Sequence, residues 1–422
     1  MQVPVVRQHR RARPAAAVAF ISAALIALSA CGGSSASTPT GASANQSITF
    51  ATAALGSELQ ATKTEIASFE KAHRNITVRL VQLASTSNDA YQQLTHYFIA
   101  GSSTPDVIDA DTAWPASFAR AGWILPLNKY VQTSALLPDA AEAGTYQGKL
   151  YAAMFYFNAE GLYYRTDLVK QPPTTPQQLV ADAQSALKQD PGLKEGLAFE
   201  GSKYEGAVTV FIDFMGAFGG GLNPAHFDTP ANLQALQFLY DVVYKYKIAP
   251  QAVTSWTEQN VQEAFTSGQT AFATNWPYVE SLVPGSAVAG KTGYVPFPSE
   301  SGKGVATLAS DALVINSHST HVAADAELIQ WLLSPGQQID RAITSGDPPS
   351  VTAAYTSALF SKAPYFQADE QVFKAGVPRL VSANYLQISA DIQDMLSSVL
   401  ANQATPAQAL QSTAQQLAKL SS

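Results

Sequence analysis

The stretch Ile48-Thr49-Phe50-Ala51-Thr52-Ala53 is short, apolar and β-branched, which is typical of a buried strand. Apolar residues at helical spacing follow it between residues 62 and 69. Residues 77–83 then alternate with a period of two, residues 91–100 have a helical pattern, and Pro105-Asp106-Val107-Ile108 opens another buried strand. This succession predicts parallel βαβ units and therefore an open α/β sheet.

The rest of the chain turns helical before it returns to strands. Four helix starts share one device, a hydroxyl side chain at the N-cap followed by a proline at the first helical position. Late strands that come back after a long helical insert predict two α/β lobes, with the chain crossing between them and a ligand cleft at the hinge. The helix starts are Thr175-Pro176, Thr229-Pro230, Ser334-Pro335 and Thr405-Pro406, and the late strands are residues 270–275, 292–295 and 312–315.

Two lobes of this kind divide the chain into four segments. We expect residues 47–155 and 297–345 to form the first lobe, and residues 156–296 and 346–422 to form the second. Each lobe would contain a sheet flanked by helices. The length of 422 residues and the hydrophobic content of 46% are enough for two sizeable cores.

Composition excludes several classes of protein. Seventeen Tyr and nineteen Phe residues spread along the chain exclude a disordered protein. A formal net charge of -7 leaves no basic surface of the kind that binds nucleic acid. Because the chain has a single cysteine, a disulfide framework, an iron–sulfur cluster and a multi-cysteine zinc site are excluded as well.

The N-terminus has the pattern of an export signal. Four arginines between residues 7 and 13 precede an apolar run at residues 15–30, which is too short to span a membrane comfortably. The run ends in Leu28-Ser29-Ala30-Cys31, which resembles the lipobox of bacterial lipoproteins. That resemblance implies a signal peptide over residues 1–30, lipidation of Cys31 and a flexible tether over residues 31–46. A plain secretory peptide or a buried structural cysteine is the alternative.

Histidine and glycine motifs give little support for a metal ion or a nucleotide. His318 and His321 are three positions apart and have no third ligand nearby, whereas catalytic zinc normally takes three protein ligands. Gly219-Gly220-Gly221 lacks the Gly-Lys-Ser/Thr of a phosphate loop. We therefore expect no metal ion and no cofactor.

Two enzyme classes remain as alternatives to a binding protein. Ser68-Phe69-Glu70-Lys71, Lys291-Thr292-Gly293 and Ser382-Ala383-Asn384 supply the three elements of a penicillin-recognising serine acyl enzyme, but their order along the chain is wrong. A glycosidase needs two carboxylates about 5–10 Å apart, of which one stays protonated. Asp111 and Asp311 are the candidates for that pair.

Aromatic and polar residues cluster in two places. Phe155-Tyr156-Phe157-Asn158 leads into a predicted strand, and Asn275-Trp276-Pro277-Tyr278 follows one. A pyranose needs flat apolar faces for its C–H groups and fixed donors and acceptors for its hydroxyls. Both clusters offer that combination, so they indicate a sugar; the alternative is that the aromatic rings only fill a core.

The order of motifs along the chain resembles that of the family 1 extracellular solute-binding proteins, the sugar-capturing subunits of ABC importers. The similarity runs from about Ser47 to Leu420 and is strongest to trehalose- and maltose-binding proteins. The resemblance implies two lobes of the periplasmic-binding-protein fold that close on a disaccharide and do no chemistry on it. The matching pieces are Pro105-Asp106-Val107, Asp111 with Ala113-Trp114, Ala121-Gly122-Trp123, residues 148–152, residues 162–165, residues 203–206, residues 265–272, residues 275–278 and Val377-Pro378-Arg379.

The resemblance also implies a binding site, residue by residue. Asp111 would accept sugar hydroxyls from the first lobe, and Asn158 would bind hydroxyls from the second. Trp276 would stack on a glucose ring, with Tyr278 packing or bonding beside it. Arg379 would reach the sugar from the late helical region of the chain.

Further positions of this site are matched less directly, and two depart from the family. Glu58, after the first strand, matches a ligand-binding acidic position. Ala309-Ser310-Asp311 stands where the related binders have Gly-Gly-Trp, and Asp347 stands where they have Trp. Polar groups in place of aromatic rings predict a shift in specificity toward another sugar, an amino ligand or a polyol. The residues assigned to the walls are Tyr156, Tyr204 and Glu205.

The family also implies partners and a location. The partners would be a sugar ligand, membrane-spanning ABC permease subunits and a cytoplasmic ATPase, with the protein itself a monomer. The lipid anchor would hold it at the outer face of the cytoplasmic membrane, at a cell surface or in a periplasm. A sensor or adhesion lipoprotein with the same fold is a further alternative.

Overall fold

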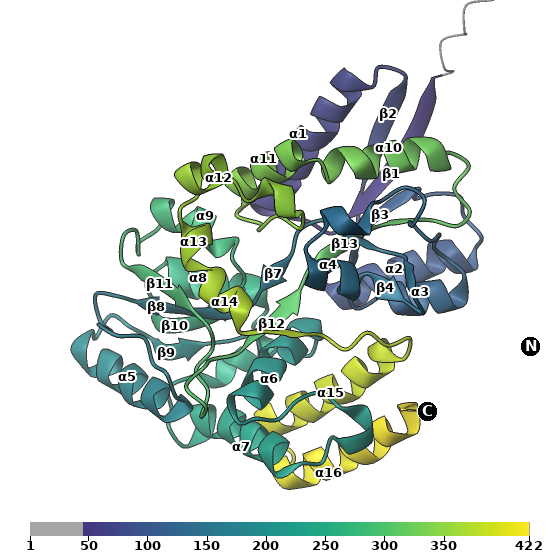
Figure 1. Cartoon of the computed structure of the whole chain (residues 1–422). Helices are drawn as coiled ribbons and strands as arrows, with labels where there is room; N and C mark the ends of the chain where they lie inside the picture. Colours follow the sequence, from purple (N-terminus) through teal and green to yellow (C-terminus); the bar gives the residue numbers. More distant parts are fainter. Residues whose placement is uncertain (1–44, 422) are drawn as a thin grey trace, which may run out of the picture. The chain divides into compact units, whose positions relative to one another are not determined.

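A computed structural model describes residues 45–421 of the chain (Figure 1). The predicted signal peptide, Cys31 and all but the last two residues of the predicted tether lie outside the described residues. Within the described part, no helix is both long and apolar enough to cross a membrane.

The first sheet has five strands in the order β2-β1-β3-β13-β6. Its first three strands are parallel, as the βαβ pattern predicts, because helices α1 and α2 connect them. The fourth strand returns from late in the chain and runs antiparallel to both of its neighbours. The strands are β1 (Gln46–Thr52), β2 (Ile76–Gln82), β3 (Val107–Asp111), β6 (Ala153–Met154) and β13 (Asp311–Ile315).

The second sheet has four strands in the order β11-β8-β10-β9, and a third sheet has the order β14-β12-β7. In the second sheet, β10 is parallel to β9 and antiparallel to β8. A two-stranded ribbon pairs β4 with β5. The bounds are β4 (Thr145–Tyr146), β5 (Lys149–Leu150), β7 (Asn158–Ala159), β8 (Gly161–Arg165), β9 (Glu195–Ala198), β10 (Thr270–Asn275), β11 (Thr292–Val295), β12 (Ala306–Ala309) and β14 (Gly376–Pro378).

The chain passes from one sheet to another at two adjacent places. Residues 155–157 join β6 of the first sheet to β7 of the third, and Ser310 alone joins β12 to β13. The two places touch, because the Ser310 hydroxyl donates to the carbonyl of Tyr156. Strand β12 lies inside residues 297–345, the segment predicted for the first lobe, yet it pairs with β7 and β14.

Helices cover the sheets in two groups. Helix α11 packs against α1 beside the first sheet, whereas α15 and α16 pack against α6 and α7 (Figure 1). The helices are α1 (Gly56–Ala72), α2 (Ser87–Ile99), α3 (Pro115–Ala121), α4 (Pro138–Ala143), α5 (Pro176–Gln189), α6 (Glu205–Ala217), α7 (Pro230–Tyr244), α8 (Glu258–Thr266), α9 (Val279–Leu282), α10 (Val322–Leu332), α11 (Pro335–Ser345), α12 (Ser357–Lys362), α13 (Tyr365–Ala368), α14 (Glu370–Lys374), α15 (Tyr385–Leu400) and α16 (Pro406–Leu417).

All four predicted hydroxyl–proline helix starts are helix starts, but only three of the hydroxyls act as caps. The side chains of Thr175, Thr229 and Thr405 each accept a hydrogen bond from the backbone N–H three residues on. Ser334 makes no such bond, because its hydroxyl donates instead to the carbonyl of Trp331 in the preceding turn, at 2.7 Å.

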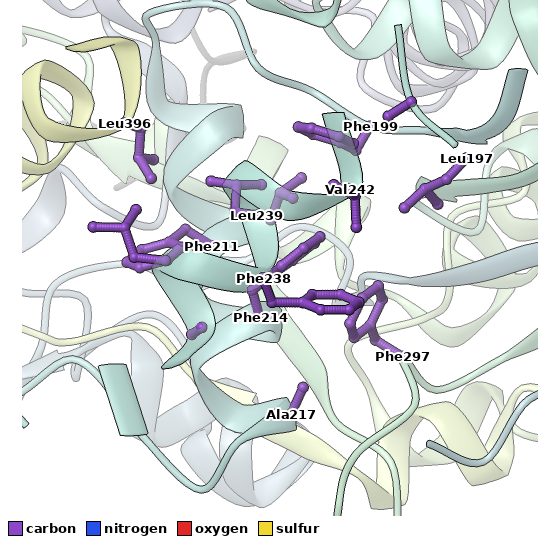
Figure 2. Packing of buried hydrophobic residues seen from close by; sticks show 14 of the residues in the cluster. Leu197, Phe199, Phe211, Phe214, Ala217, Phe238, Leu239, Val242, Phe297 and Leu396 are labelled. Atoms are coloured by element: carbon purple, nitrogen blue, oxygen red, sulfur yellow. The ribbon is translucent and has the colours of Figure 1, made fainter. Parts of the chain in front are cut away.

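A large apolar core lies between the second sheet and helices α6, α7 and α15. Phe214 is at its centre, with its ring stacked on Phe297 at 4.8 Å and tilted against Phe238 at 5.7 Å (Figure 2). Leu396 of α15 reaches the same cluster, which ties the end of the chain to this half of the molecule. Burial of about 25 cal/mol per Å² of apolar surface makes such clusters the main source of stability.

Candidate functional site

A cavity of about 540 Å³ opens where several strands of the two main sheets end. The segments that follow β1, β3 and β10 all contribute to its wall. In open α/β sheets, ligands bind at the carboxyl ends of the strands because the loops there are free to carry polar side chains. The position of this cavity therefore marks it as the candidate binding site.

The structure brings ten of the eleven residues of the predicted site together on this cavity. They come from distant parts of the chain, from α1 to the segment after β14. The ten are Glu58, Asp111, Tyr156, Asn158, Tyr204, Glu205, Trp276, Tyr278, Asp311 and Arg379.

Asp347 does not line the cavity. It is almost fully buried behind the wall, where its carboxylate lies 3.1 Å from the Nε atom of Arg341 and accepts a hydrogen bond from Ser345 at 2.7 Å. Arg341 also pairs with Glu65 of α1 at 3.0 Å. The residue thus belongs to a buried ion-pair cluster that fastens α11 to α1.

Arg379 connects the two sides of the cavity. One nitrogen of its guanidinium lies 2.6 Å from Asp111 at the end of β3, and the other lies 3.0 Å from Glu205 at the start of α6. Asp111 is held further by the Ser87 hydroxyl at 2.9 Å and by the backbone N–H of Ala113 at 2.8 Å. Glu205 in turn accepts a bond of 2.7 Å from the Tyr385 hydroxyl.

Asp311 lies directly opposite Asp111 in the pairing of β13 with β3. The Tyr156 hydroxyl donates to its carboxylate at 2.5 Å. Burial, together with the nearby charge of Asp111, raises the pKa of Asp311 to about 6, and the hydrogen bond from Tyr156 opposes that shift. The guanidinium of Arg341 lies over the ring of Tyr156, 5.0 Å from the ring centroid.

One buried amide positions the aromatic side of the cavity. Asn275 ends β10 and is almost fully buried, and its side-chain oxygen accepts from the N–H of Trp276 at 2.8 Å. The Tyr163 hydroxyl donates to the Trp276 carbonyl at 2.9 Å. The indole of Trp276 is therefore presented by a rigid strand end, with Tyr278 two residues further on along the same wall.

Two side chains on the wall leave acceptor oxygens without a partner. The side-chain oxygen of Asn158 and one carboxylate oxygen of Asp109 are buried and accept no hydrogen bond within residues 45–421. The second oxygen of Asp109 accepts from Thr52 at 2.8 Å. Unsatisfied buried acceptors are costly, so they are expected where a ligand supplies the missing donors.

Sequence reasoning missed two acidic residues of the wall, Glu258 and Asp109. Glu258 is the first residue of α8, and its backbone N–H donates to the Tyr204 hydroxyl at 2.8 Å. Burial raises the pKa of Glu258 to about 7, and burial also raises that of Asp109 well above its usual value. An acidic residue in the first turn of a helix is common for purely local reasons, so Glu258 carried little signal. Side chains two residues apart in a strand point to the same side, so the assignment of Asp111 to the site could have predicted Asp109 as well.

A second cavity, of about 560 Å³, lies on the outer side of α7. Its wall consists mainly of apolar side chains and glutamines, with Asp241 as its one ionisable carboxylate. It lacks the convergent polar groups of a specific small-molecule site. The cavity at the strand ends is therefore the better candidate.

The motifs of the serine acyl enzyme alternative contact unrelated partners, whereas the glycosidase pair, Asp111 and Asp311, lines the cavity at the strand ends. Ser68, in the last turns of α1, bonds to Gln337 at 3.2 Å, and Lys291 lies 3.9 Å from Asp167 at the edge of the second sheet. Neither residue lines the cavity at the strand ends. Among residues 45–421, no three His, Cys, Asp or Glu side chains are grouped so that they could hold a metal ion.

Comparison with known proteins agrees with this geometry. Residues 52–339 match the family model described as "Bacterial extracellular solute-binding protein". A "Probable ABC transporter-binding protein" of Deinococcus radiodurans is 30% identical over 397 residues, which cover 88% of this chain and 93% of the relative. A "Mannitol-binding protein" of Pseudomonas aeruginosa is 25% identical over 392 residues, 83% of this chain and 88% of the relative.

A solved structure gives the same result at the level of the fold. The maltose-bound MalE3 protein of T. maritima superposes with a TM-score of 0.84 at 32% identity, over 89% of this chain and 100% of that one. The predicted two-lobe α/β fold of the periplasmic-binding-protein type is thereby confirmed. The chain belongs to the bacterial extracellular solute-binding protein family.

Proposed function

We propose that this protein captures a sugar, an α-linked disaccharide such as trehalose or maltose, and delivers it to an ABC importer. The cavity of about 540 Å³ carries the proposal, because it joins the flat faces of Trp276 and Tyr278 to carboxylate and amide acceptors. The likeness to maltose-bound MalE3 supports the choice of sugar. The name of the relative from Deinococcus radiodurans supports the role in transport.

Capture would work by closure of two lobes around the sugar. Asp111 and Asp311 would hold hydroxyls from the side of the first sheet, and Trp276 would stack on a ring from the side of the second. A ligand favours closure only through contacts that it makes to both lobes at once. The junction at residues 155–157 and Ser310 would serve as the hinge.

Delivery would involve a membrane and two further components. Lipidation of Cys31 would keep the loaded protein near a permease, and a cytoplasmic ATPase would drive import. The protein would act as a monomer on the outer face of the cytoplasmic membrane. The acidic balance of the chain, with 32 acidic against 25 basic residues, would keep the body off an anionic lipid surface.

A thermal-shift titration tests the binding function. Residues 44–422, which form one compact unit, are titrated with trehalose, maltose, sucrose, glucose and a set of polyols and amino sugars. A ligand at 100 times its Kd adds about 2.7 kcal/mol to the free energy of unfolding, which raises the melting temperature by several degrees.

The pattern of responses decides the proposal. A saturable shift with an α-linked disaccharide and none with glucose supports a disaccharide carrier. A shift with a polyol alone contradicts the proposal of a disaccharide ligand but leaves the proposed role as a solute-binding protein intact. Release of reducing ends during the incubation would instead support a glycosidase.

A further inference from the structure

The cavity at the strand ends has a strong imbalance of charge. Its wall carries six carboxyl groups and one cationic side chain, Arg379. That single cation is already shared between two of the six, since it pairs with Asp111 and with Glu205. The six are Glu58, Asp109, Asp111, Glu205, Glu258 and Asp311.

The other four carboxyl groups have no cation of their own. Within residues 45–421, no ion pair reaches Glu58, Asp109, Glu258 or Asp311. The nearest buried arginine behind the wall, Arg341, is already engaged by two carboxylates. The side-chain hydrogen bonds to Asp109 and Asp311 come from the neutral hydroxyls of Thr52 and Tyr156.

The four groups come from elements of both main sheets. Glu58 stands on α1, Asp109 and Asp311 stand on neighbouring strands of the first sheet, and Glu258 begins α8, which packs against β10 of the second sheet. A buried carboxylate is stable only with a counter-charge or full hydrogen bonding. The unpartnered oxygen of Asp109 marks a place where a donor is missing.

We propose that the natural ligand is a sugar that carries a protonated amine. This inference rests on the proposed sugar-binding function and specifies the class of sugar. The ammonium would lie among Glu58, Asp311 and Glu258, where it replaces the cation that the wall lacks. The aromatic faces of Trp276 and Tyr278 suit such a ligand, because aromatic faces attract cations as well as sugar C–H groups.

The protonation of the wall agrees with this geometry. Burial raises the pKa of Asp311 to about 6 and that of Glu258 to about 7, and burial raises the pKa of Glu58 well above its usual value. A neighbouring cation favours the ionised form of a carboxyl group. Binding of an ammonium therefore releases protons. The charged groups that face these carboxyls are Asp111, Asp347, Arg341, Arg379, Glu200 and Glu205.

Calorimetric titration of residues 44–422 at pH 7.5 tests the proposal on the unaltered protein. The probes are trehalose and maltose, their 6-amino-6-deoxy derivatives, and the N-acetylated forms of those amines. We expect each amine to bind at least about tenfold tighter than its parent sugar, which corresponds to about 1.4 kcal/mol. The N-acetylated forms should lose that advantage because they keep the bulk without the charge. Titrations in two buffers of different ionisation enthalpy should report proton release for the amines.

The outcomes separate this inference from the function on which it rests. Parent sugars that bind as tightly as the amines, or amines that release no protons, overturn the ammonium site and leave the sugar carrier intact. Silence from all neutral and amino sugars overturns both.

Charge-removing variants provide a second readout. Glu258→Gln and Asp311→Asn should each reduce the ratio of amine affinity to parent affinity by at least about tenfold. Glu263→Gln, on the exposed side of the same helix α8, removes a carboxylate outside the cavity and should leave the ratio unchanged. An unchanged ratio in both cavity variants contradicts the proposal.

Discussion

Trp276 and its neighbours show how single residues make a rigid binding wall. The indole is half-buried on the cavity, and its backbone is held on both sides, by the Asn275 side chain and by the Tyr163 hydroxyl. A flat apolar group that is fixed in advance loses little conformational entropy when a sugar ring stacks on it. Such residues are expected to supply much of the binding energy.

Removing this ring should weaken sugar binding without unfolding the protein. We expect Trp276→Ala to raise the Kd of the bound disaccharide by at least about 30-fold, about 2 kcal/mol, as measured by calorimetry. Trp276→Phe keeps a flat face and should recover part of the loss. Wild-type affinity in Trp276→Ala would show that the ring does not contact the ligand.

Single residues were also the level at which sequence reasoning was least complete. Ten residues of the cavity, Asp111 and Trp276 among them, could be predicted because the resemblance to the solute-binding family implies their positions. The place of Asp347 could not, since its partner Arg341 lies on the preceding helix and only the turn at Gly346 brings the two charges together. Glu258 was missed because a first-turn glutamate looks like an ordinary helix start.

Secondary-structure elements are joined by charge as well as by apolar packing. Arg341 of α11 is fully buried and stacks over Phe155 at 4.0 Å while it pairs with Glu65 and Asp347. Removing one partner of a buried ion pair leaves the others without compensation, which costs about 3–5 kcal/mol. Arg341 therefore stabilises the contact between α1 and α11, which the bond of Ser68 to Gln337 also joins.

Chemical denaturation of a variant tests that stabilisation. Arg341→Met should reduce the free energy of unfolding by about 3 kcal/mol or more, read from the urea midpoint at constant slope. Lys374→Met breaks the exposed pair between Lys374 and Glu370 and should leave the midpoint close to wild type. If both variants unfold at the wild-type midpoint, the buried cluster does not hold α11 in place.

Elements with strong local patterns could be predicted well. Strands β10 and β11 have the predicted bounds, and the hydroxyl–proline pattern located four helix starts. The pairing of β12 outside the first sheet had no such pattern. It depends on Ser310, where the chain changes sheets within one residue, and the sequence predicted a strand only over residues 312–315.

The molecule buries many carboxyl groups whose pKa values are raised by their burial. A group whose pKa is higher in the folded state than in the unfolded state binds more protons when folded, so the stability that it contributes is lost as the pH rises. Burial raises the pKa values of six such carboxyl groups to between about 6 and about 8, against 3.8–4.5 for unperturbed groups. The six are Glu160, Glu258, Glu280, Asp311, Asp325 and Asp369.

Stability of the unliganded protein should therefore decrease from mildly acidic to mildly basic pH. Between pH 5 and pH 8 we expect the free energy of unfolding to fall by more than about 1.4 kcal/mol, the equivalent of one pKa unit. Thermal melts followed by circular dichroism at fixed ionic strength measure this. A melting temperature that rises over this range would show that these carboxyl groups are ionised in the folded protein.

For the whole molecule, the return of late strands in the sequence predicted two lobes. Only the structure shows that the two places where the chain changes sheets, residues 155–157 and Ser310, are in contact. The chain positions of β6 and β13 differ by more than 150 residues, yet the strands are adjacent in one sheet. Long-range pairing of this kind leaves no trace in local periodicity. The pairing of β13 with β3 is also long-range, and it places Asp311 opposite Asp111.

The guanidinium of Arg379 has a consequence for unloading. It lies between the carboxylates of Asp111, at the end of β3, and Glu205, at the start of α6. Separation of the lobes during ligand release would therefore pull the guanidinium away from Asp111. Water would then solvate both charges, and dissolved ions would screen their attraction. If the protein carries a ligand as proposed, we expect its release to depend on the salinity around the cell and to be faster in brine than in fresh water.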